Sequence, residues 1–277
     1  MEKVDKSRGI YIYLNGIKPI EDIPLRDDVT LLPCSCNPTP DMIINKCSSE
    51  IDIGVACIFL RSVSASLFVT GKTPKELAIS AWNSQWDAML LAALYDREIG
   101  FNFQSDVAPE NFHKANVFHI TNYNFKGLNS GELKIISCEE KKWLQKHYKS
   151  AWELLDIERF HNAIHCLASY RWHTLPRAQM ALIWSGIEGL FQIDYELSFR
   201  LSLYIAKYLA PGNIIEQKMI FDEVKKLYGT RSKAVHGGAI ESLDDSVKLS
   251  ACILRRIVMK AAEEGFLLGN DQLIFQI

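Results

Sequence analysis

Hydrophobic and polar residues follow different periods in the two halves of the chain. Up to about residue 138, short β-rich runs alternate with turn signals, whereas beyond it the apolar positions recur with the spacing of helices. The change of period predicts a domain boundary near residue 138. We therefore expect a mixed α+β domain over residues 1–138, followed by an all-α helical bundle over residues 139–277.

The N-terminal half is expected to contain several strands and one long helix. Thr73 is suited to cap a helix in which Pro74 takes the first position and Glu76 completes a capping box. This helix should reach about Tyr95 and, being rich in Ala, Leu and Trp, pack against the strands. Residues 27–50, which contain three prolines, are expected to form a loop. The expected strands are 10–14, 51–60, 63–70, 116–122 and 133–136, the second and third of them as a hairpin.

The second half is expected to be almost entirely helical. Ser137 begins a second capping box with Glu140, Gly237 follows the end of a short helix, and Gly265 ends the last helix. The expected helices are 139–155, 158–170, 176–192, 195–209, 213–228, 231–236 and 243–264.

Composition narrows the class of protein. The chain is 48% hydrophobic and 23% charged, as is ordinary for a globular protein. Its net charge of -2 excludes a protein that binds nucleic acid through overall positive charge, but it allows a local basic site. No apolar run is long enough to predict a membrane span, and no apolar stretch near the N-terminus resembles a signal peptide. Seven cysteines in a chain of this length do not suggest a disulfide scaffold, and their odd number leaves at least one unpaired within the chain. Since no export signal is visible, we expect reduced thiols and a cytoplasmic protein.

Candidate chemistry is concentrated where Arg231 and His236 flank four residues. A guanidinium suits phosphate oxygens, and an imidazole exchanges protons near neutral pH. On one continuous helix, residues five apart point about 140° away from each other. A shared site therefore needs either a frayed first turn at Arg231 or a second copy of the motif. Taken alone, the spacing favours a simpler interpretation, namely a surface arginine and a histidine that caps a helix.

The surroundings of this motif resemble the HEPN superfamily, specifically the Apea-like HEPN domains. The resemblance is carried by an apolar helix with Glu188 just before Leu190-Phe191, by a second helix containing Leu197-Ser198-x-Arg200, and by the run from Tyr228 through Arg231-Ser232 to Val235-His236-Gly237. It covers residues 176–238 closely and the rest of the C-terminal half loosely. It does not extend to the N-terminal half.

The resemblance implies an all-helical and usually dimeric domain. Many members are metal-independent endoribonucleases of bacterial defence or toxin–antitoxin systems, whose Arg-x4–6-His motifs from two chains form one composite site. Arg231 and His236 match the catalytic pair, and Ser232 matches the polar residue after the arginine. The resemblance thus implies a cofactor-free RNA endonuclease, a homodimeric toxin or antiviral effector with a regulatory or antitoxin partner. The alternative is a non-catalytic module that binds RNA or a partner protein.

Several neighbours of the motif are candidates for supporting roles. Glu188 stands among small and apolar residues, so we expect it to be buried and paired, with Arg231 as the candidate partner. The pair either orients the arginine or only holds the fold. Tyr228, one turn before Arg231, is expected to be a core aromatic with a hydrogen-bonded hydroxyl. Three lysines either attract a phosphate backbone or form a solvated helix face: Lys225, Lys226 and Lys233.

Two groups of metal-ligating residue types offer a rival interpretation. His161 and His165 stand four apart on an expected helix and could bind a metal, as in a metal-dependent hydrolase, although helix packing explains them more simply. Cys34-x-Cys36 with Cys47 and Cys57 matches no common zinc spacing. The sequence also lacks a phosphate-binding loop, a dinucleotide-binding glycine motif and a nucleophile elbow.

Overall fold

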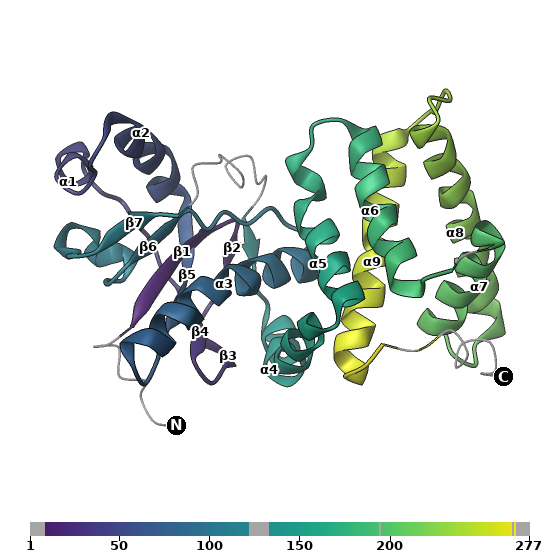
Figure 1. Ribbon diagram of the computed structural model, residues 1–277, viewed down its shortest axis with the longest axis horizontal. Helices are drawn as coiled ribbons and strands as arrows, with labels where there is room; N and C mark the ends of the chain where they lie inside the picture. Colours follow the sequence, from purple (N-terminus) through teal and green to yellow (C-terminus); the bar gives the residue numbers. More distant parts are fainter. Residues whose placement is uncertain (1–8, 122–132, 194, 268, 270–277) are drawn as a thin grey trace. The chain divides into compact units, whose positions relative to one another are not determined.

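The computed structural model describes residues 9–121, 133–193, 195–267 and 269 (Figure 1). The chain divides into two compact units: unit 1 comprises residues 1–91 and 97–149, and unit 2 comprises residues 92–96 and 150–277. Unit 1 contains a sheet and unit 2 is helical, so the α+β and helical parts follow one another as the sequence predicts. The division falls within a helix that begins at Cys138. No helix in the described part of the chain is long and apolar enough to cross a membrane.

Unit 1 is built on a six-stranded antiparallel sheet with the order β3-β4-β5-β1-β6-β7. The central strand β1 pairs with β5 on one side and β6 on the other, so that Ile12 stands opposite both Leu67 and Gln104. The strands β2 and β8 form a separate parallel pair. The strands are β1 (Ile10–Asn15), β2 (Ile17–Lys18), β3 (Ile23–Arg26), β4 (Val29–Pro33), β5 (Val63–Val69), β6 (Phe103–Ser105), β7 (Phe118–Ile120) and β8 (Lys134–Ile135).

Helices cover both faces of this sheet because its side chains alternate between them. Tyr11 and Tyr13 point to one face and share a hydrophobic core with Phe59. Ile12, between them in the strand, points to the opposite face, where it contributes to a pocket with residues of α3. The helices of the N-terminal half are α1 (Pro40–Ile44), α2 (Glu50–Phe59) and α3 (Pro74–Tyr95), of which α3 lies in unit 1 up to residue 91.

Three predictions for unit 1 are wrong. Residues 51–59 belong to α2 instead of a strand, since Ser49 accepts a hydrogen bond from the Asp52 N–H and caps the helix. The hairpin expected with residues 63–70 is therefore wrong as well, because β5 pairs with β4 and β1. Residues 27–50 are not a loop, because they include β4 and α1. Their prolines stand where regular structure tolerates them, with Pro33 at the end of β4 and Pro40 at the start of α1.

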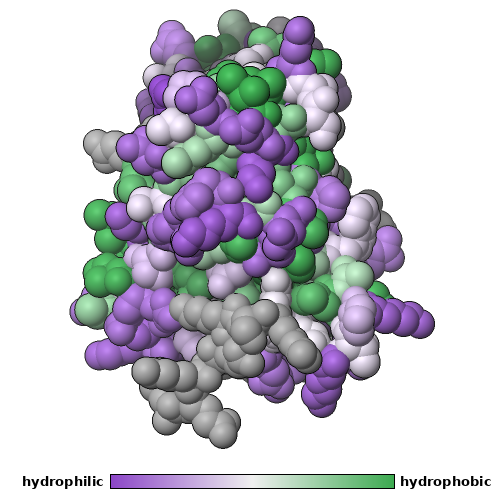
Figure 2. All heavy atoms as spheres, turned by 90° about the vertical axis from the view of Figure 1, so that its left-hand side faces the viewer, coloured by the Kyte–Doolittle hydropathy of each residue, from purple (hydrophilic) through white to green (hydrophobic). Residues whose placement is uncertain are grey.

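Other expectations for unit 1 agree with the structure. The helix predicted from Thr73 is α3, and Thr73 Oγ1 accepts from the Glu76 N–H at 3.2 Å. The strand predicted over 116–122 is shorter, Phe118–Ile120, and residue 122 lies outside the described residues. On the face shown in Figure 2, hydrophobic residues stand in separate groups among hydrophilic ones, as is normal for a protein surface.

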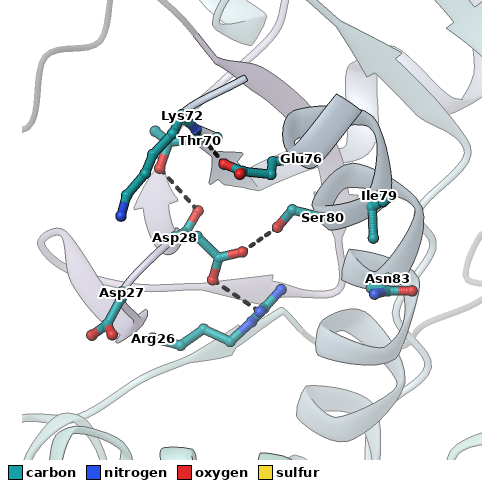
Figure 3. A pocket seen from close by; sticks show the side chains of 10 residues that line it. Arg26, Asp27, Asp28, Thr70, Lys72, Glu76, Ile79, Ser80 and Asn83 are labelled. Carbon is teal, nitrogen blue, oxygen red and sulfur yellow. Dashed lines mark hydrogen bonds and ion pairs between the residues drawn. The ribbon is translucent and has the colours of Figure 1, made fainter. Parts of the chain in front are cut away.

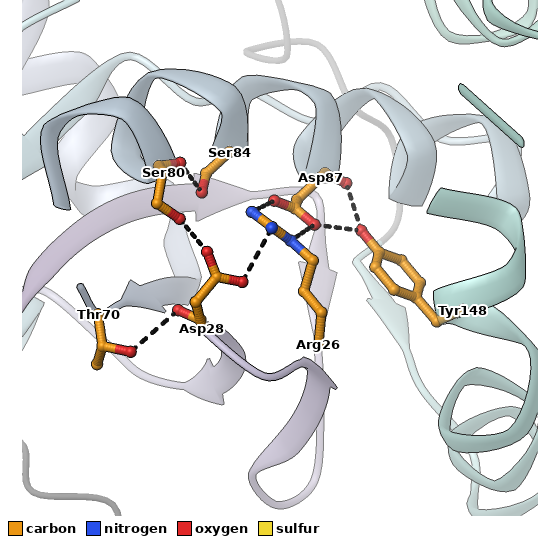
Figure 4. A network of polar contacts seen from close by, with 7 residues as sticks. All are labelled: Arg26, Asp28, Thr70, Ser80, Ser84, Asp87 and Tyr148. Atoms are coloured by element: carbon orange, nitrogen blue, oxygen red, sulfur yellow. Dashed lines mark hydrogen bonds and ion pairs between the residues drawn. The ribbon is translucent and has the colours of Figure 1, made fainter. Parts of the chain in front are cut away.

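A buried ion pair joins β3 to α3 in unit 1 (Figure 4). Arg26 donates from Nε and Nη2 to the two carboxylate oxygens of Asp87 at 3.3 and 3.1 Å, and its Nη1 lies 2.9 Å from Asp28 Oδ1. The Tyr148 hydroxyl donates to Asp87 Oδ1 at 2.8 Å. Burial raises the pKa of the Asp87 carboxyl to about 6, although Arg26 and Tyr148 both oppose the rise.

Replacing Tyr148 by phenylalanine is expected to lower the free energy of unfolding by about 1–3 kcal/mol at neutral pH, because a buried carboxylate loses a donor. Since the folded-state pKa of Asp87 is raised, its contribution to stability is complete below the unfolded-state pKa and is lost as pH rises through about 6. The hydroxyl stabilises the ionised form, so the two proteins should differ more above pH 6 than below it. Urea unfolding at about pH 4.5 and about pH 7.5 measures this difference. An equal loss at both values would contradict it, and Tyr195→Phe, an exposed site, is the control.

Unit 2 is a bundle of helices (Figure 1). Helix α6 contacts α5, α8 and α9, and α7 packs along α8. Gly186 allows α6 to approach its neighbours closely, since a Cβ there would lie 3.0 Å from Cys166 Cβ and 3.1 Å from Leu254 Cδ2. The helices of the C-terminal half are α4 (Cys138–Glu153), α5 (Glu158–Ser169), α6 (Pro176–Phe191), α7 (Leu197–Leu209), α8 (Ile214–Val235) and α9 (Leu243–Glu264).

The predicted helices agree with these bounds to within a few residues, except in α8. Residues 213–228 and 231–236 were expected as two helices, but a single helix runs through Gly229. A glycine inside a helix lowers its stability by about 1 kcal/mol without breaking it. The predicted end at Gly237 is confirmed, because this residue has a φ of 80° and the next N–H, of Gly238, donates to the Lys233 carbonyl at 2.8 Å.

Candidate functional site

The Arg-x4-His motif occupies the C-terminal end of α8. Arg231 lies within the helix, and His236 is its C-cap residue, with a backbone N–H that donates to the Ser232 carbonyl at 3.1 Å. Because the helix is continuous here, the two side chains leave it in directions about 140° apart. Arg231 is half-buried and reaches α6, whereas His236 is exposed. One chain therefore presents the guanidinium and the imidazole on different sides of the helix.

Arg231 is held by the ion pair that the sequence suggested. Its Nη2 donates to Glu188 Oε2 at 3.0 Å, and the two side chains are 23% and 24% exposed. Burial raises the pKa of the Glu188 carboxyl, and the neighbouring guanidinium opposes the rise. Arg231 Nε and Glu188 Oε1 are buried without a hydrogen-bond partner among the described residues. The guanidinium of Arg231 is thus held through Nη2, while the N–H at Nε has no acceptor among the described residues.

The aromatic ring of Tyr228 lies against the guanidinium of Arg231. The guanidinium carbon lies 5.6 Å from the centre of the Tyr228 ring, which packs edge-on against Trp184 at 5.3 Å. Trp184 is fully buried and donates from Nε1 to Ser250 Oγ at 3.0 Å. Tyr228 itself is only half-buried, and its hydroxyl has no hydrogen bond within the described parts of the chain, contrary to expectation. Burial and Glu188 raise its pKa, so the hydroxyl stays neutral.

The structure adds Arg177, a residue for which no role was predicted from the sequence. Its Nη1 donates to the Ala234 carbonyl at 2.8 Å and its Nη2 to the Gly238 carbonyl at 2.7 Å. The last carbonyls of a helix lack partners within the helix and carry the negative end of its dipole, so a guanidinium stabilises them. Arg177 thus holds the segment that carries His236. The signal in the sequence is a cation in the first turn of α6, where the dipole disfavours positive charge.

The substitution Arg177→Ala removes these two hydrogen bonds and is expected to fray the C-terminal end of α8. The free energy of unfolding should fall by about 1–2 kcal/mol, because carbonyls at the helix end lose a charged donor. Amide hydrogen exchange should accelerate at residues 236–238 and stay unchanged in the middle of the helix. Arg200→Ala is the matched control, because it removes a half-buried guanidinium that bonds Glu196 and Tyr204 at α7. Unaltered exchange at 236–238 would contradict the assigned role.

The remaining predicted residues surround the motif without a shared contact. Ser232 is half-buried in the helix, and its carbonyl serves the C-cap. Lys226 and Lys233 stand seven residues apart and therefore lie on one face of α8. Lys225 lies on another face, with its ammonium 5.7 Å from the Phe221 ring centre. All three lysines are exposed, so they are accessible to a polyanion.

The rival metal site gains no support from the geometry. Within the described ranges, no group of three or more His, Cys, Asp or Glu side chains could hold a metal ion. The four cysteines of the N-terminal half belong to one hydrophobic core. Burial raises the pKa of the Cys36 thiol to about 12 and that of Cys47 to about 11, whereas zinc is bound by thiolates. His165 packs edge-on against Trp172, with 6.4 Å between ring centres.

Unit 1 contains a polar pocket of about 610 Å³ between the β3–β4 hairpin and the start of α3 (Figure 3). Three of its charged side chains, those of Arg26, Asp28 and Glu76, are bonded to neighbouring groups. Asp28 contacts Arg26 and accepts from the Ser80 hydroxyl, and Glu76 Oε2 accepts from the Lys72 backbone N–H at 3.1 Å. Because Arg26 also pairs with Asp87, the polar side chains of this pocket belong to the ion-pair network between β3 and α3, and their structural role explains them.

No protein-family model, curated protein or solved structure matches the chain.

Proposed function

We propose that this chain is a metal-independent endoribonuclease of HEPN type, active as a homodimer. The observation that carries the proposal is the geometry of α8, in which Glu188 anchors Arg231 on one side and His236 is exposed on another. One copy does not direct both groups at one phosphate. Two copies related by a two-fold axis can bring the arginine of each chain to the histidine of the other.

The chemistry of RNA cleavage fits this pair of groups without a metal. RNA carries its own nucleophile, the 2′-hydroxyl, beside the scissile phosphate. One imidazole takes the 2′-hydroxyl proton while the O2′–P bond forms, and a second protonates the 5′-oxygen as the P–O5′ bond breaks. Guanidinium groups stabilise the charge on the phosphorane oxygens. The products are a 2′,3′-cyclic phosphate and a 5′-hydroxyl, and DNA is not cut because it lacks the nucleophile.

Two exposed apolar residues beside the motif support association at this surface. Val235 directly precedes His236 and is 47% exposed. Leu175, the N-cap residue of α6, is 68% exposed and stands two residues before Arg177, which binds the same helix end. Exposed apolar side chains beside polar groups are typical of protein interfaces. The lysines of α8, Lys225, Lys226 and Lys233, would then attract the RNA backbone.

By the same resemblance, we propose that the enzyme acts in the cytoplasm as a toxin or antiviral effector. Unit 1 would sense a trigger, restrain the nuclease or select the RNA, and a regulatory or antitoxin partner would control it.

The test is cleavage by the purified full-length chain in the presence of a chelator. RNA should be cut and single-stranded DNA of the same sequence should stay intact. Activity that disappears with chelator and returns with zinc would replace the proposal with a metal-dependent hydrolase using His161 and His165. Tight RNA binding without any cleavage would identify a non-catalytic module.

A further inference from the structure

A second pocket of unit 1, of about 360 Å³, lies between α3 and the neighbouring strands β1 and β6 of the sheet. Four of its lining residues follow the i, i+3, i+4, i+7 spacing of one helix face, so their side chains are neighbours on α3. The strands contribute through register, since Ile12 of β1 stands opposite Gln104 of β6 and both point to the face that α3 covers. The residues that define the pocket are Ala78, Ala81, Trp82, Gln85, Phe101 and Gln104.

This pocket has an aromatic wall and open space beside it. Trp82 is 74% exposed, which is unusual for so large an apolar side chain in a helix that otherwise covers a sheet. Ala78 and Ala81 precede it on the same helix face, and their small side chains leave room next to the indole ring. Phe101 supplies a second ring. A flat ligand can therefore lie against the indole without displacing protein atoms.

The polar side chains of the pocket are neutral, and of these the Thr121 hydroxyl donates to the backbone carbonyls of Phe101 and Asn102. None of the lining residues carries a formal charge, in contrast to the pocket at the β3–β4 hairpin. Gln85 and Gln104 are both half-buried, and their amides make no hydrogen bond with the residues that the structure describes. Each amide offers a donor and an acceptor side by side. Two unused amides next to an exposed indole present hydrogen-bonding edges to a planar ligand.

We propose that this pocket binds a single nucleobase, stacked on Trp82 and hydrogen-bonded along its edge by Gln85 and Gln104. Stacking on an aromatic side chain combined with hydrogen bonds to the base edge is the way proteins recognise unpaired bases. The volume lies near the lower end of the range of about 300–1,000 Å³ for small-molecule sites, which suits one base. The neutral lining indicates that the base, and not a phosphate, is the group recognised.

The base can belong to a free nucleoside or to a single-stranded RNA, and two binding measurements separate these sources. Calorimetry with adenosine, cytidine, guanosine and uridine tests the free ligand. Fluorescence anisotropy with short single-stranded RNAs, each matched to the same strand lacking one base, tests the base within a chain. The RNA arm uses full-length protein carrying His236→Ala, so that cleavage does not consume the probe. Binding of nucleosides should not depend on salt, because no lining residue is charged.

Trp82→Ala is expected to weaken binding by roughly 10- to 100-fold, the loss that follows removal of one stacked ring. Gln85→Leu and Gln104→Leu should change which base binds best. The matched control is Ile79→Ala, which removes a 51% exposed side chain from the same helix outside this pocket and should leave binding unchanged. Because Trp82 and Ile79 are both exposed, neither substitution is expected to affect folding.

Binding of nucleosides, or of RNA alone, with the expected loss on Trp82→Ala supports the inference and identifies the source of the base. The inference is overturned if Trp82→Ala binds like the parent protein, if strands lacking the base bind equally well, or if a neutral oligosaccharide binds while nucleosides and RNA do not. The readout is binding in unit 1, so its failure leaves the nuclease proposal standing, and failure of cleavage leaves this inference standing.

Discussion

Replacing His236 by alanine is expected to slow RNA cleavage by roughly 100- to 10,000-fold, because the substitution removes the proposed general acid and base. The side chain is exposed and caps the helix only through its backbone, so the free energy of unfolding should change by no more than about 0.5 kcal/mol. Loss of activity without loss of stability is therefore the expected signature. Single-turnover cleavage of a labelled RNA, together with urea unfolding, measures both quantities.

His165→Ala is the matched control for this experiment. His165 is also exposed and also lies on a helix of unit 2, but outside the motif. Its replacement should leave cleavage unchanged. If His165→Ala abolishes cleavage and His236→Ala does not, the chemistry belongs to the α5 histidines and the proposed site is wrong.

Arg231 needs a different substitution, because alanine would leave Glu188 half-buried without its cation. Arg231→Lys keeps the positive charge and removes the planar fork of donors. We expect cleavage to fall by roughly 100- to 1,000-fold, as for loss of a group that stabilises developing charge. Near-normal cleavage by this variant would show that the arginine serves the fold through Glu188 and not the reaction.

A negative charge at Val235 is expected to dissociate the proposed homodimer and thereby abolish cleavage. Val235→Glu places a carboxylate beside His236 on the surface that we propose to be buried between two copies, where an unpaired charge is strongly unfavourable. The side chain is 47% exposed in the single chain, so the fold should survive. Sedimentation equilibrium measures the dissociation, and the same samples are assayed for cleavage.

Ile58→Glu provides the comparison for the dimer experiment. Ile58 is 52% exposed on α2 of unit 1, so it receives the same change at a similar exposure away from the motif. Its variant should remain dimeric and active. A monomeric Val235→Glu protein that still cuts RNA at the parent rate would show that one copy holds a complete site.

Helices were predictable where local signals agree with the hydrophobic period. The capping box at α4 is present as the sequence suggests, with Ser137 N–H donating to Glu140 Oε2 at 2.8 Å and Glu140 N–H to Ser137 Oγ at 3.2 Å. At the end of α9, Gly265 has the positive φ, 77°, that its residue type allows. These features depend on neighbours in the chain and need no knowledge of the tertiary structure.

Residues 51–60 show why β-rich composition misleads. Their isoleucines and valine favour a strand, but the Ser49 cap and the burial of Val55 and Phe59 along one face of α2 favour a helix. Strand propensity depends strongly on packing, which the sequence does not reveal. Packing likewise keeps α8 helical at Gly229, where the sequence suggested that one helix ends and another begins.

The candidate site likewise contains features that were predictable from the sequence and features that were not. The Glu188–Arg231 pair was predictable, since a carboxylate in an apolar helix needs a partner. The roles of Arg177 and of the pocket at Trp82 were not, because each depends on residues distant in sequence. The carbonyl of Ala234 lies 57 residues beyond Arg177, and Gln104 meets α3 only through its place in the sheet.

The proposed composite site is tested most directly by a heterodimer of one unchanged chain and one chain carrying both Arg231→Lys and His236→Ala, purified through two different tags. If each active centre draws its guanidinium and imidazole groups from both copies, the heterodimer should cut RNA far more slowly than half the rate of the unchanged homodimer. A rate equal to half would mean that each chain works alone, and the account of a shared site would be wrong.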